Sequence, residues 1–198
     1  MEAGAFAVSG IIIGTLGAVS QAAHQIALSC ASFTFMVSMG LAQAGSIRVS
    51  NAFGTNNWGK ISLIGKSTLI TALVYGIACA LFFIVFRHAL PTVFTENILV
   101  IKLAALLMLF AAFFQISDST QAIGAGLLRG IKDVKVPTIL VAVSYWVIGI
   151  PSGYLLTFTF NMGPSGMWIG LTLGLTVSSL FLLKRFLVMS KKNTSVSL

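Results

Sequence analysis

Long runs of apolar residues are the feature that most constrains how this chain can fold. A helix needs about 20 apolar residues to cross the ~30 Å hydrocarbon core of a bilayer; five runs reach that length and the first barely does. The six runs cover about residues 3–19, 22–52, 63–86, 98–128, 136–158 and 165–188. Each is continuous rather than alternating, which favours membrane helices over the strands of a β-barrel. We therefore predict an all-α integral membrane fold with six transmembrane helices.

Composition supports a bilayer as the partner and argues against other classes. The chain is 57% hydrophobic and only 8% charged, whereas about a quarter of the residues in a soluble domain are charged. The net charge of +8 would suit a nucleic-acid binder, but the basic residues lie in loops between the apolar runs and form no patch, so we expect no nucleic-acid partner. Cys30 and Cys79 lie inside apolar runs and are interpreted as small hydrophobic side chains.

The distribution of Lys and Arg predicts the orientation. If the first run starts at the cytoplasm, only Arg87 and Lys102 face outward. The cytoplasmic side then holds Arg48, Lys60, Lys66, Arg129, Lys132, Lys135, Lys184, Arg185, Lys191 and Lys192. This asymmetry follows the positive-inside rule. We expect both ends of the chain in the cytoplasm, with residues 189–198 as a basic tail.

Asp118 stands out in "FFQISDSTQAIGAGLLRGIKD", residues 113–133, because the chain has only four acidic residues. Arg129 marks the expected inner surface about three helical turns later, roughly 16 Å away, which places Asp118 near the middle of the membrane. A charge there costs about 2.5–3.5 kcal/mol, and the cost is relieved when the carboxylate takes up a proton or a cation. Asp118 is thus interpreted as a functional acid. The alternative is a structural one that caps a kink or bonds across helices.

Weaker candidates accompany Asp118. Gln115 and Gln121 share its helical face and predict a polar wall. Trp146 lies in mid-span, either as core packing or as an aromatic wall for a flat organic cation. His24 is expected to be packed or hydrogen-bonded rather than a ligand. No Ser/His/Asp set, HExxH motif, P-loop or cysteine cluster is present, so we expect neither an enzyme nor a bound cofactor.

Glu2 has two interpretations from the residues alone. It is either an ordinary solvated end or part of a helix that begins further upstream, with the acid inside the membrane. The shortness of the first run mildly favours the second interpretation.

Five motifs in order carry a family resemblance: "AAHQIAL", "MGLAQAGSIRVSNAFG", "QISDSTQAIGAGLLRGIKD", "YWVIGIPSGYLL" and "GPSGMWIGLTLGL". Together they resemble the multidrug and toxic compound extrusion (MATE) transporters of the bacterial NorM type, over about residues 2–186. The match is to the second half of such a transporter, helices seven to twelve of two six-helix lobes. The resemblance implies exchange of small organic cations for H⁺ or Na⁺ at the inner (plasma) membrane of a bacterium.

The resemblance also implies roles for particular residues. Glu2 falls on an acid within helix seven of the family, and Asp118 falls on the acid of helix ten, so the two look like a cation-coupling pair. Phe114, Gln115, Gln121 and Trp146 are candidates for the cavity wall. NorM-type relatives often carry tyrosine where this chain has Phe114. The missing hydroxyl weakens the case for Na⁺ at Asp118 and Glu2 and favours H⁺.

Further expectations concern what the chain does alone. The resemblance implies that the chain lacks an N-terminal six-helix lobe and part of helix seven, so we expect no transport without that partner. A lipid or polysaccharide flippase of the same superfamily, an inactive membrane fragment and a channel remain as alternatives. A flippase should show cationic residues in its cavity, and a channel should show polar stripes on several helices, whereas only the fourth run has such a stripe.

Overall fold

The computed structural model describes residues 2–194 and is helical, with no strand in that range. Its long helices are α1 (Glu2–Gly14), α2 (Ala18–Gly54), α3 (Trp58–Phe86), α4 (Ile98–Gly130) and α7 (Pro164–Thr194). The fifth predicted span consists of α5 (Lys135–Val143), the π-helical η2 (Ser144–Gly149), α6 (Ile150–Tyr154) and the π-helical η3 (Leu155–Thr159). A short 3₁₀ turn, η1 (Pro91–Val93), precedes α4. The predicted all-α class is confirmed.

Within the described residues, five of the six predicted spans are long and apolar enough to cross a bilayer. The first is not: α1 has 13 residues and ends at Gly14, short of the predicted boundary at 19. Gly17 interrupts the run at a φ of 109°, a conformation that suits glycine and few other residues, and α2 begins one residue later. At the other end α7 continues to Thr194, so much of the predicted tail is helical, and residues 195–198 lie outside the described part.

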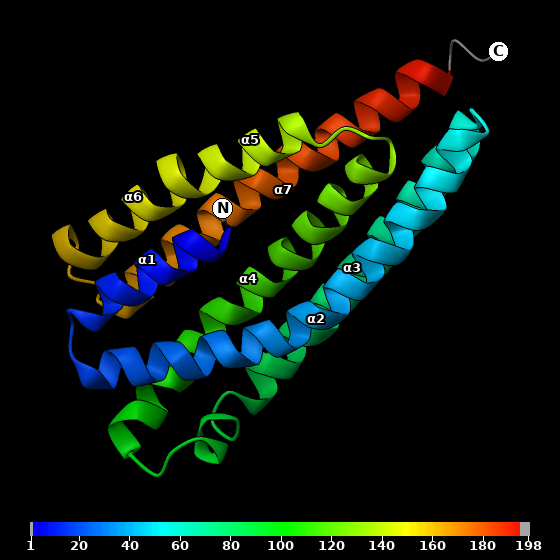
Figure 1. Ribbon diagram of the computed structural model, residues 1–198. Coiled ribbons are helices and arrows are strands. Elements are labelled where there is room, and N and C mark those ends of the chain that lie inside the picture. Colours follow the sequence, from blue (N-terminus) through cyan, green and yellow to red (C-terminus); the bar gives the residue numbers. More distant parts are fainter. Residues whose placement is uncertain (1, 195–198) are drawn as a thin grey trace.

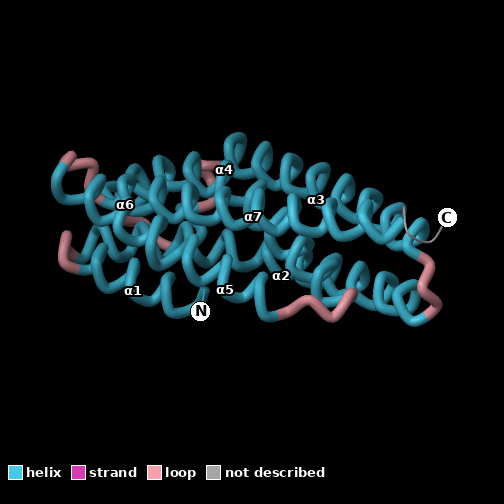
Figure 2. Tube along the Cα trace, turned by 90° about the horizontal axis from the view of Figure 1, so that it is seen from above, coloured by secondary structure: helices cyan, strands magenta, loops and turns pink. Residues whose placement is uncertain are grey.

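The helices form one bundle around α4. This helix lies between the α2–α3 pair and the group made by α5, α6 and α7 (Figure 1), and it packs against α2, α3 and α7. Figure 2 shows the helices running side by side with loops between them. The short α1 packs mainly on α2, with lighter contact to α6, η2 and α7.

Local signals set where the helices begin. Asn57 and Asn97 each precede a helix, and their side-chain oxygens accept hydrogen bonds from backbone N–H groups of the first turn, Lys60 N at 2.9 Å and Leu99 N at 3.0 Å. Such caps satisfy donors that would otherwise be left without partners at a helix end. Gly163, with a φ of 59°, turns the chain immediately before α7.

Small residues let α4 and α7 approach their neighbours closely. A Cβ added at Gly126 of α4 would lie 2.6 Å from the backbone oxygen of Ala42 in α2. On α7, Gly166 and Gly174 face the fifth span in the same way, at 2.6 Å from Leu156 C and 2.7 Å from Ser144 O. Membrane helices pack without a hydrophobic driving force between them, so close contact between backbones is a main source of their association.

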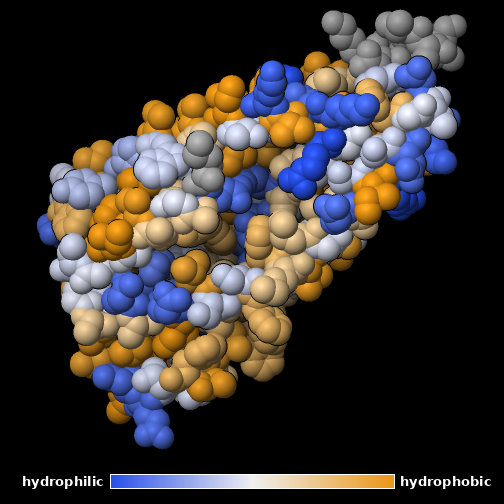
Figure 3. Space-filling model, in the orientation of Figure 1, coloured by the Kyte–Doolittle hydropathy of each residue, from blue (hydrophilic) through white to orange (hydrophobic). Residues whose placement is uncertain are grey.

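The outer surface agrees with a bilayer environment. Many large apolar side chains are exposed along α3 and on the outward face of α2, among them Phe33, Ile70 and Val74. Figure 3 shows hydrophobic residues over much of one face and hydrophilic ones gathered toward the end where the chain terminates. The same face is hollowed beside the start of α1.

A pair of glycine substitutions tests the α2–α4 contact. We expect Gly126→Ala to lower the free energy of unfolding by about 1–3 kcal/mol, because the obstacle is a backbone oxygen that must move away. Gly40→Ala, in a helix with nothing within 4 Å, should be neutral or stabilising by up to about 1 kcal/mol. Thermal unfolding in detergent measures both. Equal melting temperatures would show that this contact does not hold the helices together.

Candidate functional site

Hydrogen bonds on both sides of Asp118 fix the middle of α4. The hydroxyl of Ser117 lies 2.8 Å from that of Thr176 in α7, and the hydroxyl of Ser119 lies 2.8 Å from that of Ser38 in α2. Residues before and after the acid are thus tied to different helices. The carboxylate of Asp118 is left facing the space between α1, α2 and α4.

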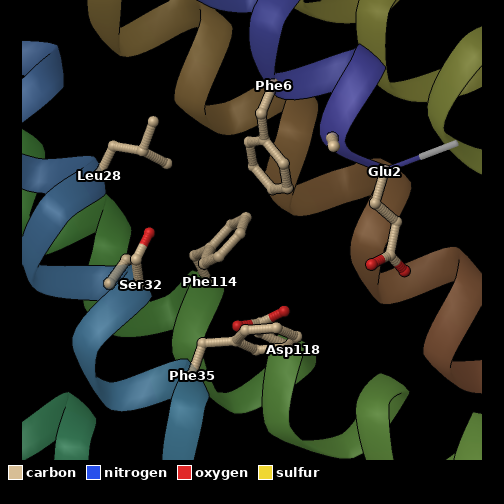
Figure 4. A pocket seen from close by; sticks show the side chains of 9 residues that line it. Glu2, Phe6, Leu28, Ser32, Phe35, Phe114 and Asp118 are labelled. Carbon is tan, nitrogen blue, oxygen red and sulfur yellow. The ribbon is translucent and has the colours of Figure 1, made fainter. Parts of the chain in front are cut away.

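That space is a cavity of about 380 Å³, which we call the acid cavity. Its lining residues are Glu2, Ala3 and Phe6 of α1, Leu28, Ala31, Ser32 and Phe35 of α2, and Phe114 and Asp118 of α4. Figure 4 shows the two acids entering it from different helices, with the rings of Phe6 and Phe114 between α1 and α4. Both predicted acids therefore line one cavity.

Asp118 is buried without a hydrogen-bond donor. Its side chain is 8% exposed, and no residue in the described range donates to its carboxylate. The structure therefore offers no contact for the structural role of capping or bridging. Burial of an unpaired carboxylate is costly, and a second carboxylate on the same cavity adds repulsion when both are ionised. The arrangement favours uptake of a positive charge.

Glu2 is held by a short chain of polar groups. The Gln121 amide donates to the Glu2 carboxylate, and the Tyr145 hydroxyl lies 3.5 Å from the Gln121 side-chain oxygen. Gln121 and Tyr145 are buried. Gln121 thus contacts Glu2, one of the two proposed coupling acids, but does not itself line the acid cavity. Tyr145, in η2, was missed in the sequence because nothing there indicates which face of the fifth span turns inward.

Phe114 lies in the wall as expected and brings no oxygen to it. Its ring is 2% exposed and makes edge contacts with Phe6 and Trp168, at centroid distances of 5.8 and 5.6 Å. No group of three or more His, Cys, Asp or Glu side chains occurs within residues 2–194. A metal cation in the cavity would have the two carboxylates and neutral oxygens such as that of Ser32.

Two other predicted wall residues lie elsewhere. Gln115 is completely buried, does not line the acid cavity, and its amide has no partner among the described residues. Trp146 is 44% exposed and lies over α1, where a Cβ on Gly4 would be 3.3 Å from its ring. The structure thus gathers Glu2, Asp118 and Phe114 on one cavity and leaves Gln115 and Trp146 outside it.

The α2 side of the cavity was not anticipated. Leu28, Ser32 and Phe35 lie three or four residues apart, so they share one helical face. This spacing is visible in the sequence, but it does not reveal that the face turns toward two acids. Phe6, four residues after Glu2, follows the same rule on α1.

In the described part of the chain, five helices long enough to span a bilayer pack with the short α1 around a cavity that carries two acids, and the comparisons show which family has this arrangement. A family model described as MatE matches residues 1–155. The chain is 40% identical to the "Probable multidrug resistance protein NorM" of Xanthomonas axonopodis pv. citri and 40% identical to the "Multidrug resistance protein MdtK" of Proteus mirabilis, covering 98% of this chain in each case. The chain belongs to the MATE family.

The fold comparison gives the same result. The crystal structure of the eukaryotic MATE transporter AtDTX14 superposes with a TM-score of 0.88 at 22% identity, over 98% of this chain and 45% of that one. The chain spans 43% of the length of the NorM and MdtK relatives. The predicted fold, one lobe of a MATE-type transporter, is confirmed. The curated relatives carry the names of drug-resistance proteins, not of enzymes.

The contact between Gln121 and Glu2 can be tested by stability. We expect Gln121→Leu to cost about 1–3 kcal/mol, because the Glu2 carboxylate loses its donor while staying half-buried. Replacing both partners, Glu2→Leu with Gln121→Leu, should cost less than Gln121→Leu alone. Gln43→Leu, on the exposed face of α2, is the control. Simple addition of the two single effects would count against the contact.

Proposed function

We propose that this chain is the C-terminal lobe of a cation-coupled multidrug antiporter. The observation that carries the proposal is the placement of two carboxylates, Glu2 and Asp118, on one cavity lined mainly by apolar side chains. Its relatives are named multidrug resistance proteins. Apolar and aromatic walls suit lipophilic organic cations, and the acids suit a coupling proton or Na⁺.

The two acids couple drug export to cation entry because two ionised carboxylates without a bound cation are unfavourable in this cavity. A ligand shifts a conformational equilibrium only by its different affinity for the two states. With the cavity closed and dry, an ionised pair of carboxylates is unfavourable, so occupancy by H⁺ or Na⁺ favours one state. Exposure to drug and water relieves the same cost in the other state. Alternation between them exchanges drug for the coupling cation.

The proposal includes a partner and a location. An N-terminal six-helix lobe would close the acid cavity from the side that α1, α2 and α4 leave uncovered, and the chain alone would not transport. The lobe would lie in the inner membrane of a bacterium with both ends in the cytoplasm. The excess of Lys and Arg at that side supports this orientation.

Other functions fit the cavity less well. A flippase for anionic lipids or polysaccharides would need cationic walls, and no Lys or Arg among the described residues lines the acid cavity. A channel would need a polar path, whereas this cavity is mostly apolar. If the chain had no role in transport, neutralising the acids would not change efflux, and substitution of Asp118 tests this alternative.

Neutralising Asp118 gives the decisive test. In cells lacking other pumps, the chain is co-expressed with the N-terminal lobe of a NorM relative and ethidium efflux is followed. We expect Asp118→Asn to reduce the efflux rate about a hundredfold. The neutral amide removes the buried charge, so cation binding can no longer offset its cost of ~2.5–3.5 kcal/mol and drive the conformational change. Glu2→Gln should act in the same direction. Glu96→Gln, an exposed acid, is the control. Undiminished efflux with Asp118→Asn would support an inactive fragment.

The coupling ion is tested at Phe114. With Na⁺ and pH gradients imposed separately on vesicles of the two-lobe transporter, we expect the pH gradient to drive efflux. Phe114→Tyr adds an oxygen at the wall and should raise the response to Na⁺ about fivefold, for one contact of about 1 kcal/mol. Phe113→Tyr, 64% exposed on the same helix, should not. A transporter driven equally by Na⁺ before and after the change would contradict the role given to Phe114.

A further inference from the structure

A second cavity, separate from the acid cavity, lies between α1 and α2. We call it the His24 chamber; its volume is about 410 Å³. Its lining residues are Phe6, Ala7, Gly10, Ile11, Gly14, Gln21, His24, Gln25 and Leu28. It runs from the α1–α2 turn beside Gly14 to Phe6, a length of about 12 Å for eight helical steps of ~1.5 Å. It thus begins near one end of the bundle and ends beside the acids.

The chamber is built around polar groups that have no partner. His24 is 1% exposed, and neither of its ring nitrogens, Nδ1 and Nε2, has a hydrogen bond within the described residues. The buried side-chain oxygen of Gln21, one turn earlier, is likewise unpartnered. Buried polar groups in proteins are almost always bonded to protein or to ordered water.

Glycines on α1 make the room above these groups. A Cβ built on Gly10 would lie 3.8 Å from the Nε2 of His24, and one built on Gly14 would lie 3.6 Å from the side-chain oxygen of Gln21. Gly10 and Gly14 are one turn apart, as are Gln21 and His24, so each polar group faces a glycine across the chamber. On its other side the His24 ring makes an edge contact with Trp168 at 5.9 Å.

The His24 chamber and the acid cavity share two residues of their walls. Phe6 and Leu28 line both. Phe6 also makes edge contacts with Phe114 and Tyr145, at 5.8 and 6.0 Å, so its ring lies at the junction between the two spaces.

We propose that the His24 chamber holds water and is the passage by which the coupling cation reaches Glu2 and Asp118 from the α1–α2 end of the bundle. The inference rests on the proposed antiport function for its use, but not for the presence of water. Within the part of the chain that the structure describes, no charged side chain lines the chamber. Its neutral donors and acceptors hold water molecules in place rather than trapping the ion. A volume of about 410 Å³ has room for several waters at ~30 Å³ each.

The first experiment asks whether the chamber is wet, and it needs no transport. In the two-lobe protein, Cys30 and Cys79 are replaced by serine, the N-terminal lobe carries no cysteine, and Gly10→Cys is the single thiol. We expect a membrane-impermeant methanethiosulfonate reagent added outside to label it. Val74→Cys, 64% exposed on α3 and expected to face lipid, should stay unlabelled. Adding Gly14→Phe should slow labelling of Gly10→Cys, because the ring would fill the entrance over Gln21.

Failure to label Gly10→Cys, or labelling that Gly14→Phe leaves unchanged, would overturn the proposal. The first result would mean a dry chamber. The second would mean that the reagent arrives by another route, such as the space between the lobes.

The second experiment asks whether the water serves the coupling step. We expect His24→Leu to slow cation-driven efflux about tenfold, because it removes the groups that bond water, and His24→Gln to restore most of the rate. His88→Leu, an exposed histidine outside the chamber, is the control. Thermal unfolding of each variant separates loss of folding from loss of function.

The outcomes distinguish the two proposals. Full efflux with His24→Leu, or equal loss with His24→Leu and His24→Gln at unchanged stability, would overturn the passage. Labelling of Gly10→Cys as expected, together with no efflux from the unsubstituted two-lobe protein, would keep the wet chamber and reject the antiport function instead.

Discussion

The hydrocarbon of a bilayer offers no hydrogen-bond partner, and every part of this structure depends on that constraint. It requires the backbone to be helical across the membrane, since only a helix satisfies its own N–H and C=O groups within one segment. It makes buried hydroxyl pairs such as Ser38–Ser119 valuable. It also makes an ionised Asp118 costly, because no residue in the described range donates a hydrogen bond to this buried carboxylate. The function we propose uses that cost.

The same constraint explains what the sequence could predict. Hydropathy follows from the order of the residues alone, so the five long apolar helices of the described range could be predicted. The depth of Asp118 in a bilayer stays a prediction from helix rise. The family resemblance added Glu2, which composition would have left as a chain end. The early end of α1 was missed because a single glycine conformation at Gly17, and no change in hydropathy, decides it.

Rotation about each helix axis could not be predicted in the same way. Gln115 and Gln121 were expected beside Asp118 in the wall. Each residue is rotated by about 100° about the helix axis from the one before it, and the packing of neighbouring helices decides which direction lines a cavity. Gln121 turns to Glu2, whereas Gln115 is buried outside the acid cavity. The glycines at 166, 170 and 174 of α7 were visible in the sequence as a small-residue repeat, but only the packed structure shows that the fifth span rests on them.

That glycine contact has a consequence for how the protein can evolve. Where two backbones touch, as at Gly166 and Gly174, there is no space for a side chain of any chemistry. Substitutions at these positions are therefore not tolerated. The α2 wall of the acid cavity is different, because Leu28, Ser32 and Phe35 border open space and can change in size or polarity without disturbing a helix crossing. Sequence change is therefore tolerated along this wall, whereas the α7 crossing must stay as it is.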